Sequence, residues 1–135
     1  MNKSSYRILA VEDNASDVFL MREALKEHGV NADLTVITNG QSAIRYFSLM
    51  RREDPVPELI LLDVNLPRKN GLEVLKGLRA NPLLQQVPVI VFTSSESFDD
   101  RAEAARLQAQ AFVRKSMDLD EFLQIGAVVK NLLEP

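Results

Sequence analysis

The chain carries five short, nearly unbroken apolar blocks separated by longer amphipathic stretches. The blocks are Ile8–Val11, Leu34–Ile37, Leu59–Leu62, Val89–Phe92 and Ala111–Val113. Apolar runs of this length, without regular polar alternation, are typical of strands buried on both faces of a parallel sheet. The second block contains Thr35 and has polar neighbours, so it is placed at an edge of the sheet.

Between the blocks, the apolar residues recur at helical spacing. The stripes are Val18, Met21 and Leu25; Ala43, Phe47 and Met50; Gly71, Val74, Leu75 and Leu78; Phe98, Ala102 and Ala105; and Phe122, Ile125, Gly126, Val129 and Leu133. Five strands alternating with five helices predict a doubly wound α/β fold, in which helices cover both faces of a parallel sheet. The charged, proline-bearing stretch 51–57 is expected to be an inserted loop.

Composition narrows the class of protein. The 135 residues fit one domain, so residues 1–135 are expected to form a single domain without an output domain. Because the chain has no cysteine, it can have neither a disulfide nor a thiolate metal site. A net charge of −3 without a long basic run argues against DNA as a partner. The sequence has no membrane-spanning apolar stretch and no secretory signal, and we expect a cytoplasmic protein.

Polar residues follow four of the apolar blocks directly. They are Glu12 and Asp13 after the first block, Asp63 and Asn65 after the third, Thr93 after the fourth and Lys115 after the fifth. In an open parallel sheet the carboxyl ends of the strands lie along one edge, and ligands bind there. These side chains are therefore expected to meet in space although they are far apart in the sequence.

Each of these residues also has a simple structural interpretation. Acids after a strand stabilise the amino end of the next helix, and hydroxyl residues form caps and turns. The combination favours a site, because three carboxylates brought together repel one another unless a cation lies among them. Carboxylate oxygens are ligands that suit Mg²⁺, so the cation is expected to be Mg²⁺, with Mn²⁺ as a substitute. The single histidine, His28, lies late in the first helix and is expected to be a surface residue.

The ordered set of an acidic pair, Asp63 in the run DVNLP, Thr93 and Lys115 resembles the receiver domain of two-component response regulators over the whole chain. The resemblance implies a flavodoxin-like sheet with the strand order 2-1-3-4-5. It also implies that Asp63 is the nucleophile that takes a phosphoryl group from a histidine kinase, while Lys115 pairs with the phosphoryl oxygens and Thr93 hydrogen-bonds to them.

The resemblance assigns further roles by position. Asp13 and Asp63 would bind the metal directly, Asn65 through its backbone carbonyl and Glu12 through water. Phe112 would be the aromatic switch residue that responds to movement of Thr93. The only reaction implied is the phosphorylation and dephosphorylation of the chain itself, so the protein is not expected to be a metabolic enzyme.

Two features depart from the usual receiver pattern. Lys115 is followed by Ser116 instead of proline, and the loop before the third strand is long. Since a cis bond before a residue other than proline is costly, the Lys115–Ser116 peptide is expected to be trans. Both features resemble the phytochrome-associated subgroup of stand-alone receivers, which adds a bacterial phytochrome to the candidate kinases.

Without an output domain, the signal would leave through a partner or through self-association. The last helix carries Leu119, Leu123, Val128 and Leu132 outside its core stripe. These residues either pack locally or form a homodimer interface, since large apolar patches mark interfaces.

Two other functions share parts of this pattern. A phosphatase of the haloacid-dehalogenase type also uses an aspartate nucleophile with Mg²⁺, but it places a second Asp two residues later, where this chain has Asn65. A pseudo-receiver would use the same fold as a pure binding module that never takes phosphate. Turnover of a small phosphate ester would indicate the phosphatase, and labelling of Asp63 by a small phosphodonor would indicate the receiver.

Overall fold

The computed structural model describes residues 5–135 and confirms the alternation of strands and helices. In chain order the elements are β1 (Tyr6–Val11), α1 (Ala15–Glu27), β2 (Ala32–Ile37), α2 (Gly40–Leu49), β3 (Leu59–Leu62), α3 (Gly71–Arg79), the 3₁₀ helix η1 (Pro82–Leu84), β4 (Val89–Thr93), α4 (Phe98–Arg106), β5 (Ala111–Arg114), α5 (Leu119–Leu123) and α6 (Ile125–Leu133). Each apolar block has become a strand.

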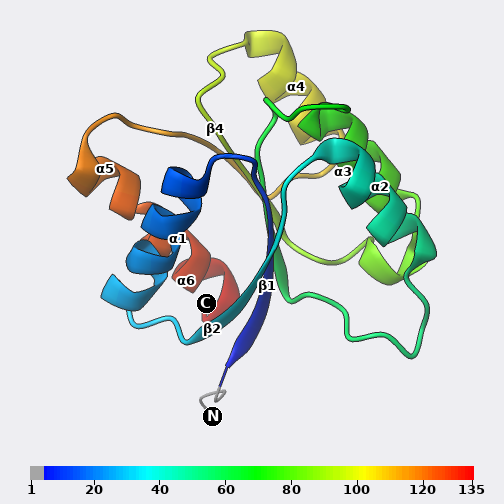
Figure 1. Ribbon diagram of the computed structural model, residues 1–135, viewed down its shortest axis with the longest axis horizontal. Helices are drawn as coiled ribbons and strands as arrows, with labels where there is room; N and C mark the ends of the chain where they lie inside the picture. The colour runs from blue at the N-terminus through cyan, green and yellow to red at the C-terminus, as the bar shows by residue number, and fades with distance from the viewer. Residues whose placement is uncertain (1–4) are drawn as a thin grey trace.

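Within residues 5–135 the strands form one parallel sheet with the order β2-β1-β3-β4-β5, as the resemblance implied. Strand β2 lies at an edge, as its polar residues predicted. The registers Val11 with Leu62 and Leu62 with Val91 bring the carboxyl ends of β1, β3 and β4 to nearly the same level. The loops after these strands therefore lie together at the top of the molecule in Figure 1.

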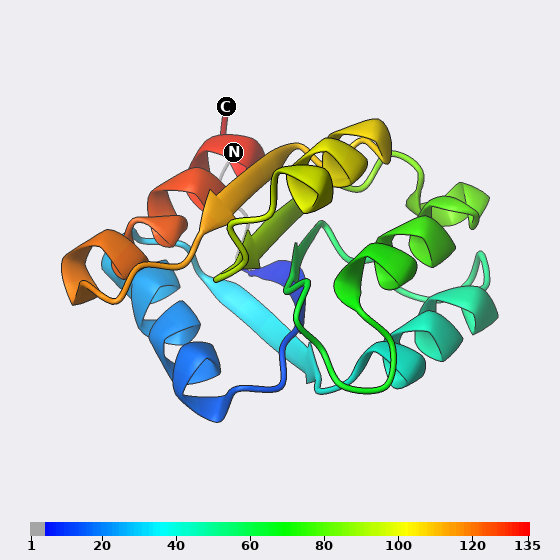
Figure 2. The same cartoon turned by 90° about the horizontal axis from the view of Figure 1, so that it is seen from above.

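Helices cover both faces of the sheet. Helices α1, α5 and α6 lie on one face and α2, α3 and α4 on the other, as Figures 1 and 2 both show. Alternate residues of the central strands point to opposite faces of the sheet. In β1, Leu9 and Val11 belong to the apolar core under α2 and α3, whereas Ile8 and Ala10 belong to the core under α1 and α6. Burial on both faces explains why these strands are continuous apolar runs.

The predicted helical stripes are buried in α2 and α3, and mostly buried in α1 and the last helices. The stripe predicted for α4 is wrong: Phe98, Ala102 and Ala105 are exposed, and Ala104 is the buried residue. The helix itself is present. Alanine carries little apolar area, so this stripe could not determine which face of α4 turns towards the sheet.

The last helix consists of two consecutive segments, α5 and α6, that meet at Gln124. Gly126 packs so closely on Ala24 of α1 that a side chain there would overlap the Ala24 backbone. His28 packs beside Gly126, and its Nε2 atom is buried, so the expectation of a surface histidine is wrong. Because the end of α1 packs against α6, helix α6 covers part of the His28 imidazole.

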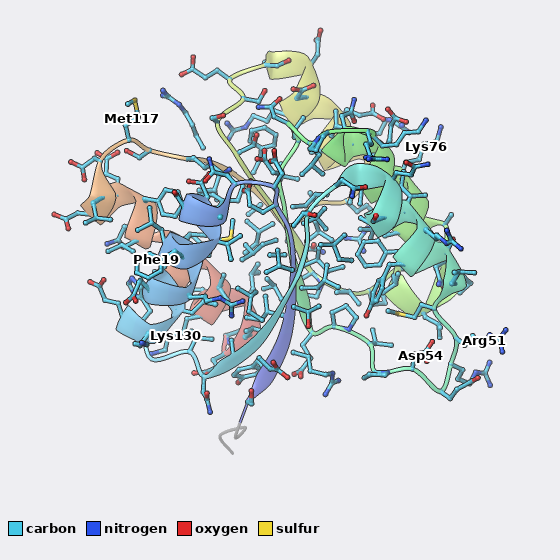
Figure 3. The ribbon with its side chains drawn as sticks, in the orientation of Figure 1. Phe19, Arg51, Asp54, Lys76, Met117 and Lys130 are labelled. Carbon is cyan, nitrogen blue, oxygen red and sulfur yellow. The ribbon has the colours of Figure 1, made fainter. Side chains whose placement is uncertain are left out.

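Residues 51–57 form the loop that the sequence predicted, between α2 and β3. Figure 3 shows Arg51 and Asp54 in this loop, at the end of the molecule opposite the carboxyl ends of the strands. The Arg51 backbone N–H donates to Asp54 Oδ2 at 2.8 Å, which closes the turn. No helix among residues 5–135 is both long and apolar enough to span a bilayer.

Candidate functional site

The first acidic pair lies where β1 leads into α1. Glu12 is the residue after β1 and is buried, with an exposed fraction of 1%. Its Oε2 atom accepts a hydrogen bond from the Asn14 backbone N–H at 3.2 Å. Asp13 is exposed beside it. Asn14 caps α1, because its Oδ1 accepts from the Asp17 backbone N–H at 3.0 Å.

Asp63 follows β3 and is also buried, with an exposed fraction of 5%. Its backbone N–H donates to the Val11 carbonyl at 3.1 Å, which extends the β1–β3 pairing to the site. Its Oδ1 atom accepts from the Asn65 backbone N–H at 3.1 Å, so the loop fixes the orientation of the carboxylate. Asn65 itself is exposed.

Thr93 and Lys115 come from the last two strands. Thr93 ends β4 and is completely buried, and its Oγ1 accepts from the Ser95 backbone N–H at 3.3 Å. The Lys115 backbone N–H donates to the Thr93 carbonyl at 2.7 Å, so Lys115 continues the β4–β5 pairing by one residue. The side chain of Lys115 is 9% exposed and turns towards the acids.

The ammonium of Lys115 connects three carboxylates. Its Nζ atom lies 2.6 Å from Glu12 Oε1, 2.8 Å from Asp17 Oδ2 and 3.0 Å from Asp63 Oδ2. An ammonium carries three N–H donors, and here each has a carboxylate acceptor. Residues from the ends of β1, β3 and β5 and from the first turn of α1 therefore meet at one atom.

Burial and the contacts between opposite charges shift the pKa values of this cluster in opposite directions. Burial raises the pKa of the Glu12 carboxyl above its usual value; the Lys115 hydrogen bond opposes the rise and the Asp63 charge adds to it. Burial by itself would lower the pKa of Lys115, but the hydrogen bonds that Lys115 donates to Asp17, Glu12 and Asp63 outweigh burial and raise the pKa. Lys115 therefore stays cationic and offsets part of the negative charge.

The acidic groups also fit a divalent cation. One carboxylate oxygen from each of Glu12, Asp13 and Asp63 lies within 4.8 Å of the others, with two of the three residues buried. Carboxylate oxygens at this spacing suit a hard cation such as Mg²⁺ or Mn²⁺. A single ammonium does not neutralise three or four carboxylates, and a cation would remove the remaining repulsion.

Phe112 and Ser116 lie on either side of Lys115. Phe112 is half-buried in β5 and packs against the core under α2 and α3, and the Arg101 guanidinium sits 5.2 Å from its ring centre. Ser116 Oγ donates to Glu121 Oε2 at 2.8 Å and so joins the connection to α5. Among residues 5–135 all peptide bonds are trans, including Lys115–Ser116 as expected.

Asp17 is the residue of this cluster that the sequence did not reveal. An acid in the first turn of a helix is ordinarily explained by the helix dipole, and Asp17 occupies such a position in α1. The feature that could have revealed it is its place on the turn that directly follows Glu12 and Asp13. The chain bends there, so a side chain four residues beyond Asp13 can return to the strand ends.

Comparison with known proteins agrees with this geometry. The sequence matches the response regulator receiver domain family over residues 8–126. The response regulator Rcp1 of Synechocystis sp. is 35% identical over 120 residues, which cover 87% of this chain and 82% of Rcp1.

Two solved structures of phytochrome-related or metal-bound regulators are similar to this chain. The phosphorylated cyanobacterial phytochrome response regulator RcpA has a TM-score of 0.86 at 32% identity, covering 96% of this chain and 95% of the other. The Mn²⁺-bound form of Rcp1 has a TM-score of 0.84 at 33% identity, with coverages of 96% and 95%.

Proposed function

We propose that this chain, which belongs to the response regulator receiver domain family, accepts a phosphoryl group on Asp63 from a histidine kinase in the cytoplasm. The single observation that carries the proposal is the contact of the Lys115 ammonium with Glu12 and Asp63, at 2.6 and 3.0 Å. This contact places a cation beside Asp63, the buried carboxylate that follows β3.

The proposed reaction transfers a phosphoryl group from a phosphohistidine to Asp63. A carboxylate oxygen of Asp63 forms the new P–O bond while the P–N bond to the kinase breaks, and the electron pair remains on the imidazole nitrogen, which then takes a proton. Both reactants are anionic, so cationic groups at the acceptor lower the barrier. Lys115 supplies one such charge, and Thr93 supplies a hydroxyl donor to the phosphoryl oxygens.

Glu12, Asp13 and Asp63, with the backbone carbonyl of Asn65, are the residues that would hold Mg²⁺ or Mn²⁺. The support is the spacing of the three carboxylates, within 4.8 Å of one another. When bound, the cation supplies further neutralisation of the phosphoryl oxygens. The residues of the chain orient the acceptor: the Asn65 backbone N–H fixes Asp63 Oδ1 and leaves Oδ2 on the side of Lys115.

The phosphorylated domain would then change the surface that it offers to a partner. We propose Thr93 and Phe112 as the switch pair, since Thr93 is buried at the site and Phe112 is half-buried on the neighbouring strand. We propose a histidine kinase as the upstream partner, with a bacterial phytochrome as the candidate class because Rcp1 and RcpA are similar to this chain. We propose that residues 1–135 form a single domain, and because its net charge is −3 we do not propose DNA as its partner.

Self-association through the last helix is a second proposal about partners. Leu123, Val128 and Leu132 are half-buried against the core under α1 and α6, so they are largely used within the domain. Leu119 is 55% exposed at the start of α5, and Met117 before it is fully exposed. A homodimer at this end would bury Leu119 and Met117, and Figure 3 shows Met117 on the α1 and α5 side of the molecule.

Intact-mass measurement after incubation with acetyl phosphate and Mg²⁺ tests the phosphorylation proposal. We expect the wild-type chain to gain one phosphate and Asp63→Asn to gain none. A chelator should prevent labelling of the wild type, because the cation is then removed. The matched control is Asp33→Asn, which removes an exposed negative charge on β2 and should be labelled like the wild type.

The same measurement addresses the rival functions. Equal labelling of Asp63→Asn and wild type would show that Asp63 is not the acceptor. Absence of labelling in every protein would favour a pure binding module. Continuous release of phosphate from small esters, without a labelled chain, would favour a phosphatase. Asn65 argues against the last outcome, since an amide cannot serve as the general acid that such an enzyme needs.

A further inference from the structure

We propose that the Asp17 carboxylate pairs with the Lys115 ammonium in the unphosphorylated protein, and that the phosphoryl group on Asp63 displaces Asp17 from this ammonium. Phosphorylation would thereby release the first turn of α1 from the residue that follows β5. The inference rests on the proposed function and adds a form of regulation to the same site.

All the hydrogen-bond donors of the Lys115 ammonium are already in use. Its three N–H groups already have acceptors in Glu12, Asp17 and Asp63, at distances of 2.6, 2.8 and 3.0 Å. An ammonium has no fourth donor to offer. If a phosphoryl oxygen on Asp63 pairs with Lys115, that oxygen must take the place of one of these carboxylates.

Exposure indicates which carboxylate is displaced. The side chain of Glu12 is completely buried and that of Asp63 is 6% exposed, whereas that of Asp17 is 22% exposed. A buried carboxylate that loses its partner becomes an uncompensated charge, while a partly exposed one regains water. With the phosphoryl group on Oδ1 of Asp63, its Oδ2 keeps its place 3.0 Å from Lys115 Nζ. Asp17 is therefore the carboxylate whose release costs least.

The displaced contact is also the one that joins a helix to the site. Glu12 and Asp63 directly follow strands, but Asp17 belongs to α1. Its backbone N–H remains capped by Asn14 Oδ1 at 3.0 Å, so the helix persists when the side chain is freed. The exposed Phe19 lies two residues further along the same helix, on its outer side in Figure 3. Phosphorylation would thus alter the mobility of a helical surface that carries an aromatic side chain.

The first test compares labelling rates at subsaturating acetyl phosphate with Mg²⁺. Asp17→Asn removes the competing charge and keeps an acceptor of the same shape, so we expect it to be labelled at least about threefold faster than wild type. Asp33→Asn, which removes the same charge at the amino end of β2, should match the wild type. A rate for Asp17→Asn equal to that of Asp33→Asn would contradict displacement. A slower rate would make Asp17 a residue that positions Lys115, and would also contradict it.

The second test measures amide hydrogen exchange with and without beryllofluoride, a phosphoryl mimic, in the presence of Mg²⁺. In the wild type we expect exchange in residues 15–20 to increase when the mimic binds, while α2 stays unchanged. In Asp17→Asn, exchange in residues 15–20 should already be high without the mimic. An unchanged first turn in mimic-bound wild type would overturn this inference alone, whereas a wild type that gains no phosphate overturns the proposed function with it.

Discussion

Arg79 at the end of α3 shows how one side chain can hold several segments together. Its guanidinium donates to the carbonyls of Leu84 at 2.7 Å and Val87 at 2.9 Å, near η1. It also donates to Leu107 at 3.2 Å and Gln108 at 3.0 Å, in the turn before β5. The planar fork of arginine can reach several acceptors at once, which a lysine cannot. Arg79 therefore determines how the turns leading to β4 and β5 lie.

Replacement of Arg79 by alanine should destabilise the protein. The substitution leaves several partly buried carbonyls without their donors, so we expect the free energy of unfolding to fall by about 2–3 kcal/mol. Chemical denaturation measures this change. Arg45→Ala, an exposed arginine on α2, serves as control and should change stability by less than about 0.5 kcal/mol. A similar effect of both substitutions would contradict the proposed role.

At the scale of elements, α3 begins unusually close to the site. A Cβ atom on Gly71 would overlap the backbone carbonyl of Asp63. The Gly71 backbone N–H donates to the Val64 carbonyl at 2.8 Å, which closes the loop that carries Asp63 and Asn65. Gly40 makes a similar approach to Lys69 from the start of α2. Two glycines thus allow the helices to hold the acceptor loop from one side.

Two alanine substitutions within α3 should have opposite effects. Gly71→Ala forces the helix away from Asp63, so we expect a loss of stability of about 2 kcal/mol or more, together with slower labelling. Gly77→Ala places its Cβ 3.8 Å from the Ile44 side chain, an ordinary contact. Alanine is the better helix former, so Gly77→Ala should gain about 0.5–1 kcal/mol. Thermal unfolding of both variants checks the pair, and equal effects would contradict the close approach.

At the scale of the whole molecule, the two segments of the last helix differ in how much of their apolar surface is buried. Helix α6 is tightly packed on α1 through Gly126 and contributes Ile125 and Val129 to the core. Helix α5 and the loop before it leave Leu119 and Met117 exposed. On the other side of the sheet, Leu49 of α2 is exposed to a similar extent. Leu119 and Met117 are the exposed apolar residues at the last helix, and the proposed homodimer would bury them.

Sedimentation at micromolar concentration, with and without beryllofluoride, tests the dimer. We expect Leu119→Glu to weaken association about tenfold or more, because it places a charge in the interface. Leu49→Glu adds the same charge on the other side of the sheet and should leave association unchanged. A wild type that stays monomeric in both conditions, or equal effects of the two substitutions, would contradict a dimer through the last helix.

Sequence patterns predicted the fold because the strands are buried on both faces. Such strands must be apolar throughout, so each was visible as a block, and the residue after each block was visible as well. Parallel strands end at one edge, and the meeting of Glu12, Asp63 and Lys115 therefore followed from the order of the blocks. The positions of these residues could be derived without coordinates.

Features that depend on the rotation of helices were decided by tertiary structure alone. The exposed Phe98, the half-buried His28 and the contact of Asp17 with Lys115 all depend on which face a helix turns inwards. Weak apolar stripes do not determine that rotation, because small residues and long polar side chains fit several orientations at similar cost. The sequence by itself determined which residues end the strands, and only packing decided which helical residues reach them.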